Sequence, residues 1–333
     1  MSPSPTPLKF LFPAWYAIVM GLCGLALAWV RATPLMGDAA TAAALAIGAL
    51  AAAVFGVLAV ATVVRGRRYP EAWAEDRRHP VRHTFIATLP IAVILLATVA
   101  VALGLAGPLV EALWAVGALA QLFVTVWVLG RWWKGNGAGG LVWASVTPAL
   151  FIPIVGNVLV PLAGVPLGHA EWSAAQFGVG LLFWPVVMIL IGARILTQGL
   201  WPDRLRPASF IVIAPPAVVG LAALQFGAPT LVAWALWGMA MFSFLWVGLQ
   251  GRTIAALPFG LAHWGLSFPL AALAALTLRL AGPAGFMANL GVLLLALASL
   301  VIVALVLGTV RGLRDGSLLA PEPVAAIQPA PAP

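Results

Sequence analysis

The sequence predicts an all-α integral membrane protein with ten transmembrane helices arranged as five helical hairpins, in which the odd-numbered helices form an inner pore ring. Three observations carry this prediction: an apolar composition, a succession of long apolar stretches, and an uneven distribution of proline. The 333 residues are 63% hydrophobic and 8% charged, and the mean hydropathy is +1.08. A soluble domain is typically about a quarter charged, so this composition excludes an ordinary soluble protein.

The apolar stretches define the domain organisation. A helix needs about 20 apolar residues to cross the hydrocarbon core of a bilayer. On this basis the predicted spans are 13–30, 39–64, 84–105, 110–130, 141–163, 173–198, 208–226, 229–249, 259–281 and 285–310. We therefore expect one transmembrane channel domain over 13–312. The flanking segments 1–12 and 313–333, rich in Pro, Ser and Ala, are expected to be disordered and cytoplasmic.

The basic residues predict the orientation of the spans. Fourteen of the 17 Lys and Arg residues fall on one side, whereas Arg31 and Arg279 fall on the other and Arg194 lies near the end of the sixth span. Cytoplasmic loops carry the excess of positive charge, so both termini are expected in the cytoplasm of a multi-pass plasma (inner) membrane protein. The formal charge of +8 is then explained by topology, and we expect no nucleic-acid partner.

The spans repeat in pairs. The pairs begin near 13, 84, 141, 208 and 259, a period of about sixty residues that is typical of a repeated helical hairpin. Prolines concentrate in the first member of each pair, whereas only the sixth among the even-numbered spans has one. A general tolerance of membrane helices for proline does not explain this bias. Kinked helices around a central path do, because broken backbone at depth must face protein or a cavity. The prolines of the odd-numbered spans are Pro13, Pro90, Pro148, Pro153, Pro215, Pro216 and Pro269.

The ninth span contains the candidate gate. Proline cannot donate its N–H and crowds the carbonyl four residues back, so the helix is expected to kink or open at Phe268–Pro269. A phenyl ring across such a path acts as a steric and dewetting gate, and Phe268 is the predicted gate. Gly21 and Gly24 permit close backbone approach, which serves either helix packing or a narrow pore wall. The pore-lining candidates are Gly21, Gly24, Phe85, Pro90, Phe151, Pro153, Phe210, Pro215, Pro216 and Pro269.

Residues that carry catalytic or metal chemistry are sparse. All nine carboxylates fall in predicted loops, at span ends or in the C-terminal tail, so a carrier using a buried acid is disfavoured. The four histidines and the single cysteine, Cys23, have no metal-ligand spacing. We therefore expect no metal, no cofactor and no enzymatic activity. Isolated polar residues such as Gln121 and Asn157 are expected to hydrogen-bond between helices.

Five stretches together resemble one family. They are FPAWYAIVMGLCGLALAW at 12–29, HPVRHTFIATLPI at 79–91, TPALFIPIVGN at 147–157, RPASFIVIAPPAVVGLAAL at 206–224 and HWGLSFPLAALA at 263–274. In this order they resemble the tellurite-resistance/dicarboxylate transporter family, which includes TehA-type bacterial channels and the slow anion channels of plant guard cells. The resemblance implies ten helices as five hairpins, an inner five-helix pore in each protomer, and a homotrimer. It also implies that Phe268 occludes the pore.

Two functions remain open at this stage. The first is a passive membrane channel for small monovalent anions such as chloride or nitrate, with a phenylalanine gate in each protomer. The alternative is a secondary transporter that exports C4-dicarboxylates or other oxyanions related to sulfite or tellurite, with proton coupling through a histidine such as His263. The expected partners are small inorganic or organic anions and the lipid bilayer.

Overall fold

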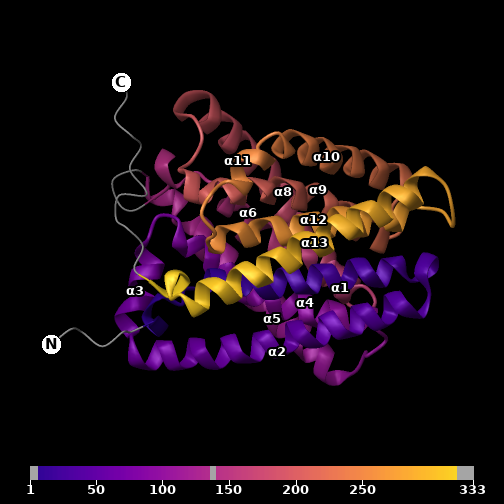
Figure 1. Ribbon diagram of the computed structural model, residues 1–333, viewed down its shortest axis with the longest axis horizontal. Coiled ribbons are helices and arrows are strands. Elements are labelled where there is room, and N and C mark those ends of the chain that lie inside the picture. The colour runs from indigo at the N-terminus through magenta and orange to yellow at the C-terminus, as the bar shows by residue number, and fades with distance from the viewer. Residues whose placement is uncertain (1–6, 136–139, 321–333) are drawn as a thin grey trace.

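The computed structural model describes residues 7–135 and 140–320, and within these ranges every regular element is a helix (Figure 1). The α-helices are α1 (Ala17–Met36), α2 (Asp38–Arg68), α3 (Pro70–Arg78), α4 (Thr88–Ala102), α5 (Pro108–Gly130), α6 (Phe151–Leu159), α7 (Pro161–Gly164), α8 (Ala170–Gln198), α9 (Ala214–Gln225), α10 (Thr230–Gly248), α11 (Gly251–Ala255), α12 (Ser267–Leu280) and α13 (Phe286–Arg314). The 3-10 helices used below are η1 (Pro7–Phe10), η2 (Pro13–Tyr16), η3 (Arg82–Ala87), η6 (Pro148–Leu150), η7 (Asp203–Ile213), η8 (Leu261–Leu266) and η9 (Ser317–Leu319). The all-α membrane class is confirmed.

Nine of the ten predicted spans correspond to helices that are long and apolar enough to cross a membrane, counted over the described residues. The predicted fifth span, 141–163, differs. Its apolar helical part is the shorter stretch Pro148–Gly164, in which α6 ends at Leu159 and α7 begins at Pro161. Pro161 has no N–H to donate, so the helical hydrogen bonding is interrupted at this point.

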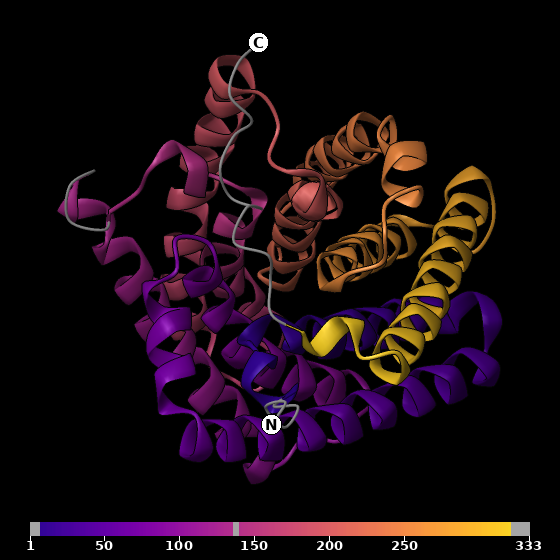
Figure 2. The same ribbon diagram turned by 60° about the vertical axis from the view of Figure 1, so that its left-hand side comes forward.

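The helices form an inner and an outer group, and Figure 2 shows the bundle turned by 60° from the view of Figure 1. In the long helices of spans one, three, seven and nine, 61–83% of the most apolar 18-residue stretch is buried. In the even-numbered spans the buried share is only 17–33%. Large apolar side chains such as Val57, Phe123, Phe242 and Leu300 are exposed on the outer helices, where lipid can replace protein as the apolar neighbour. The predicted division between odd and even spans is confirmed.

The inner helices share one local construction. In the spans of α4, α6, α9 and α12, a 3-10 segment runs directly into the α-helix. A proline is the third residue of each of these four α-helices: Pro90, Pro153, Pro216 and Pro269. The backbone N–H of the first residue of each of these α-helices donates to a carbonyl of the preceding 3-10 turn, whereas the proline at the third residue has no N–H to donate. The opening predicted at Phe268–Pro269 is thus a change from 3-10 to α-helix inside the span.

The short links between paired helices lie at one end of the bundle, and η1 and the C-terminal end of α13 lie at the other (Figure 1). The link between α1 and α2 is the single residue Gly37, whose φ of +59° favours glycine because it has no Cβ. We call the end that holds the links the link end, and the end that holds η1 and η9 the cavity end.

Part of the terminal segments predicted to be disordered has regular structure. Residues 7–10 form η1, whose Lys9 carbonyl accepts a hydrogen bond from Arg65 Nε at 3.0 Å. After α13, residues 317–319 form η9, and the side chain of Leu318 lies against Gly312. Residues 1–6 and 321–333 of these predicted segments lie outside the described residues.

A buried polar cluster joins α5, α6 and α8. The carbonyl of Pro153 accepts hydrogen bonds from Gln121 Nε2 at 2.7 Å, Thr125 Oγ1 at 2.6 Å and Asn157 Nδ2 at 3.0 Å. Gln176 Nε2 donates to Asn157 Oδ1 at 3.0 Å. Buried carbonyls and amides need partners of this kind, so the cluster holds the shortened fifth span to its neighbours. The interhelical hydrogen bonding expected of Gln121 and Asn157 is confirmed.

Candidate functional site

A cavity of about 770 Å³ occupies the cavity end and reaches the interior of the bundle. Its walls come from all five odd-numbered spans and from the segments before them. A chloride-sized ion is far smaller than this volume, which is typical of pockets that hold drug-sized ligands. The cavity therefore has a large enough volume to hold a hydrated small anion.

The inner part of the cavity is lined by the beginnings of the inner α-helices. Ala17, Thr88, Phe151 and Ala214 are the first residues of α1, α4, α6 and α9, and Phe268 is the second residue of α12. The N-terminus of a helix carries about half a positive elementary charge. The first backbone N–H of each of these five α-helices already donates to a carbonyl of the preceding 3-10 turn, so the positive charge at these ends is reduced, and no charged side chain is among the five residues.

Hydroxyl side chains fix two of the junctions between 3-10 and α-helix. Thr88 Oγ1 donates to the carbonyls of Phe85 at 2.7 Å and Pro13 at 2.6 Å. Ser267 Oγ donates to the carbonyl of Trp264 at 2.6 Å. The Thr88 bonds tie η2 to α4 across 75 residues of sequence. The conformation at the inner part of the cavity is thus held by buried hydrogen bonds.

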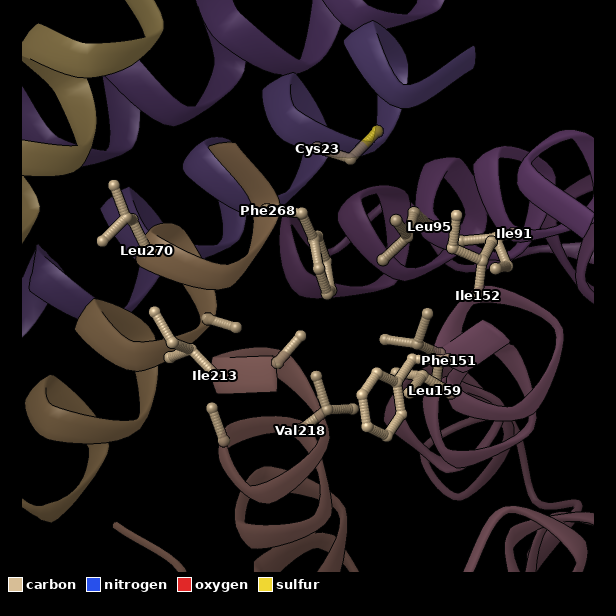
Figure 3. Close-up of a cluster of buried hydrophobic side chains, with 14 of the residues drawn as sticks. Cys23, Ile91, Leu95, Phe151, Ile152, Leu159, Ile213, Val218, Phe268 and Leu270 are labelled. Atoms are coloured by element: carbon tan, nitrogen blue, oxygen red, sulfur yellow. The ribbon is translucent and has the colours of Figure 1, made fainter. Parts of the chain in front are cut away.

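Phe268 lies at the inner part of the cavity and is 7% exposed. Figure 3 shows its ring pointing away from α12 toward a space that Leu95 of α4, Phe151 of α6 and Val218 of α9 also face. The side chains around the ring are apolar, so the region beyond the cavity offers an ion no hydrogen-bonding side chain from these residues. A phenyl ring in such a place excludes water as well as ions.

Two glycines of α1 allow α12 to approach closely. A Cβ at Gly24 would lie 2.9 Å from Phe268 Cδ2 and 3.3 Å from Ala271 Cβ. A Cβ at Gly21 would lie 2.3 Å from Ser267 Oγ. Of the two roles that the sequence left open for these glycines, close packing of helices is the one these contacts describe. Gly24 lies directly against the ring of the candidate gate.

The mouth of the cavity is lined by charged residues that are largely paired with one another. Arg65 Nη2 and Asp76 Oδ2 are 2.7 Å apart, and both side chains are almost completely buried. Arg82 Nη1 lies 3.6 Å from Asp76 Oδ1 and 3.4 Å from Glu75 Oε1. The Arg82 guanidinium also lies over the ring of Phe12, 5.5 Å from its centroid.

Burial raises the pKa of the Asp76 carboxyl, and the neighbouring guanidinium groups of Arg65 and Arg82 oppose this shift. Removing one partner of a buried ion pair leaves an uncompensated charge and is strongly destabilising. The pair therefore fixes the position of α3 at the mouth.

The predicted site residues fall into two groups. Phe85, Phe151, Phe268 and Pro269 line the cavity. The remaining candidates do not line it: Gly21, Gly24, Pro90, Pro153, Phe210, Pro215 and Pro216.

Thr88 and Ala214 also line the cavity, although the sequence had not pointed to either residue. Both lie within two residues of a proline at the start of an α-helix. Their closeness to a proline at the start of an inner α-helix is the sequence feature that could have identified them as cavity residues.

His263, the residue considered for proton coupling, also lines the cavity. Its Nδ1 lies 3.2 Å from the backbone nitrogen and 3.0 Å from the carbonyl oxygen of Gly260. Its ring stacks on Phe259 with centroids 5.3 Å apart. Over the part of the chain that the structure describes, no group of three or more His, Cys, Asp or Glu residues could hold a metal ion.

Comparison with known proteins gives a match over most of the chain. Residues 11–310 match the SLAC1 family, whose description is "Voltage-dependent anion channel". Two similar proteins from Arabidopsis thaliana are the S-type anion channels SLAH2 and SLAH1. SLAH2 is 26% identical over 159 residues, covering 47% of this chain and 30% of SLAH2. SLAH1 is 26% identical over 130 residues, covering 38% of this chain and 34% of SLAH1. Each match spans about a third of the relative's length.

Proposed function

The chain belongs to the SLAC1 family, and from that premise we propose that it is a passive membrane channel for small monovalent anions, such as chloride and nitrate, whose path is closed by Phe268. The main support, beside the family, is a cavity that is lined by the beginnings of five inner α-helices and by Phe268 itself. Helix dipoles attract an anion without binding it as tightly as a buried cation would, and conduction requires that an ion can leave.

The positions of the acidic residues also support a passive path. Among the described residues, the carboxylates nearest to an apolar span lie in first helical turns, as Glu111 and Glu171 do, or in the segments at the cavity end. A proton-coupled carrier usually places an ionisable group at depth. We therefore propose neither an enzymatic reaction nor a carboxylate relay.

The gate is tested by anion flux in liposomes that contain purified protein. We expect Phe268→Ala to raise chloride and nitrate flux at least tenfold, which corresponds to lowering a barrier by about 1.4 kcal/mol. Phe242→Ala is the matched control, because Phe242 is 67% exposed on the outer helix α10. Flux of Phe268→Ala that equals the flux of Phe242→Ala would refute the assignment of the gate.

One observation favours the alternative of a secondary transporter for C4-dicarboxylates or other oxyanions: His263 faces the cavity. A carrier of this kind predicts flux of malate or sulfite that depends on a pH gradient and is lost in His263→Ala. A channel predicts flux that follows the anion gradient and is insensitive to the pH gradient. Measuring chloride, nitrate, sulfite and malate with internal pH monitored separates the two mechanisms.

We propose a homotrimer in the plasma (inner) membrane, with both termini in the cytoplasm. The orientation rests on the clustering of basic residues at the cavity end. Cys23 is the only cysteine and is buried, so a single introduced cysteine can be labelled selectively. A membrane-impermeant maleimide should label Ala284→Cys but not Ser317→Cys in intact spheroplasts, and the reverse pattern would refute the orientation. Native mass spectrometry of the purified protein tests the trimer and should give the mass of three chains. Chemical cross-linking in membranes that yields only monomers would contradict the trimer.

A further inference from the structure

Two arginines stand apart from the other basic residues because they lie toward the link end. Arg31 is near the end of α1, and Arg279 is in the last turn of α12. Both helices belong to the inner group. Arg31 is half-buried and Arg279 is exposed.

The helical register places both arginines in line with the candidate gate. Gly24 of α1 lies against Phe268 of α12. Arg31 follows Gly24 by seven residues and Arg279 follows Phe268 by eleven, which are close to two and three full turns of an α-helix. Each arginine therefore lies on the same face of its helix as the Gly24–Phe268 contact. With a rise of about 1.5 Å per residue, the arginines lie about 10 Å and about 16 Å further toward the link end.

The helices α1 and α12 pack against one another, so the shared register brings both arginines to the same side of this helix contact. Within the ranges that the structure describes, neither arginine makes an ion pair or a hydrogen bond through its side chain. The nearby end of the bundle has carboxylates, but Glu111 is bound to His169 with Oε1 and Nε2 2.7 Å apart. Asp38, in the first turn of α2, makes no ion pair with Arg31. Two adjacent like charges without a carboxylate are stabilised when an anion binds between them.

We propose that Arg31 and Arg279 together bind a small monovalent anion at the end of the path that lies opposite the cavity. Guanidinium groups present planar pairs of N–H donors, which bind an oxyanion through two parallel hydrogen bonds. The cavity would then lie on one side of Phe268, and this anion site would lie on the other side. This inference rests on the proposed anion path, and a lipid phosphate offers the same chemistry as a free oxyanion.

The first experiment measures flux in the Phe268→Ala background, where the gate side chain is absent. Nitrate concentration is varied on the link-end side and, separately, on the cavity side of oriented liposomes. We expect Arg31→Gln with Arg279→Gln to raise the half-saturating nitrate concentration at least fivefold on the link-end side and to leave the cavity side unchanged. Arg67→Gln is the matched control, because Arg67 is exposed at the cavity-end terminus of α2. An unchanged concentration dependence on the link-end side would overturn the proposal.

A second experiment does not depend on conduction. A ligand that binds only the folded protein stabilises it by RT ln(1 + c/Kd), where c is the free ligand concentration, and so raises the Tm as this concentration exceeds Kd. Nitrate should raise the Tm of the detergent-purified protein with Phe268 intact, and the double Arg→Gln variant should lose at least half of that shift. If Phe268→Ala does not conduct but this loss is seen, the site stands and the proposed channel function fails. If the shift requires anionic lipid and nitrate has no effect, the pair binds headgroups and the proposal is overturned.

Discussion

The contact between Gly24 and Phe268 gives a sharp test of the gate without removing the ring. Gly24→Ala adds one methyl group to α1 at the point where α12 approaches it. The added Cβ would lie 2.9 Å from Phe268 Cδ2, 3.5 Å from Phe268 Cε2 and 3.3 Å from Ala271 Cβ. Favourable separations between carbon atoms are about 3.5–4.0 Å. The ring must therefore move by about 0.6 Å or more, because the Cβ of Ala271 is fixed to its helix.

The size of the effect follows from the cost of this overlap. Inserting a methyl group into a packed interior costs about 1–3 kcal/mol. The cost falls on the closed position of Phe268 and is relieved when the ring rotates away from α1. Since about 1.4 kcal/mol corresponds to a factor of ten in an equilibrium, the population of the displaced ring should rise about 5-fold to about 150-fold. Basal anion flux should increase by the same factor while the displaced population is small.

The assay is chloride and nitrate flux in liposomes, normalised to the amount of folded protein. Gly56→Ala is the matched control, because a Cβ at Gly56 on α2 meets no atom within 4 Å. Gly24→Ala should have little further effect when Phe268 is already alanine, since residues in contact are not additive. Flux of Gly24→Ala equal to that of Gly56→Ala, with Phe268→Ala conducting, would refute the argument that Gly24 holds the ring in place.

Three further predictions concern the scaffold. Gly156→Ala should lower the Tm in detergent by breaking the buried polar cluster, because the added Cβ would overlap the side-chain amide of Gln121. Overpacking of this kind costs about 1–3 kcal/mol. The control Gly192→Ala should leave the Tm unchanged, because a Cβ at Gly192 meets no atom within 4 Å. Arg65→Gln should destabilise the fold by about 3–5 kcal/mol, because the buried carboxyl of Asp76 loses its nearer guanidinium and keeps only Arg82, 3.6 Å away; a chemical unfolding midpoint equal to that of wild type would contradict this. Because burial raises the pKa of Asp76 above its value of 3.8 in the unfolded chain, its contribution to the free energy of unfolding should be greatest below pH 3.8 and should fall as pH rises through the folded-state pKa. Asp76→Asn should remove that pH dependence, and an unchanged pH profile would exclude Asp76 as its source.

Much of the membrane fold could be predicted from local sequence. The long apolar stretches fixed nine helices within a few residues, because hydrophobic length is set by the bilayer. The proline bias identified the inner helices, because a proline at depth must face protein. Pro90, Pro153, Pro216 and Pro269 occupy the same position in their helices, so the repeat seen loosely in the spacing is more regular in the structure.

The sequence alone therefore determined the membrane class, the pairing of helices and which helices are buried, since these follow from hydrophobicity and backbone chemistry along the chain. Tertiary structure decided what depends on atoms far apart in sequence. It showed that Gly24 lies against Phe268, that Pro153 accepts hydrogen bonds from α5, and that Arg65 is buried against Asp76. It also placed Arg31 and Arg279 on the sides of α1 and α12 that face each other, toward the end opposite the cavity. Packing between helices sets these contacts, and no local pattern in an apolar sequence encodes which helix faces meet.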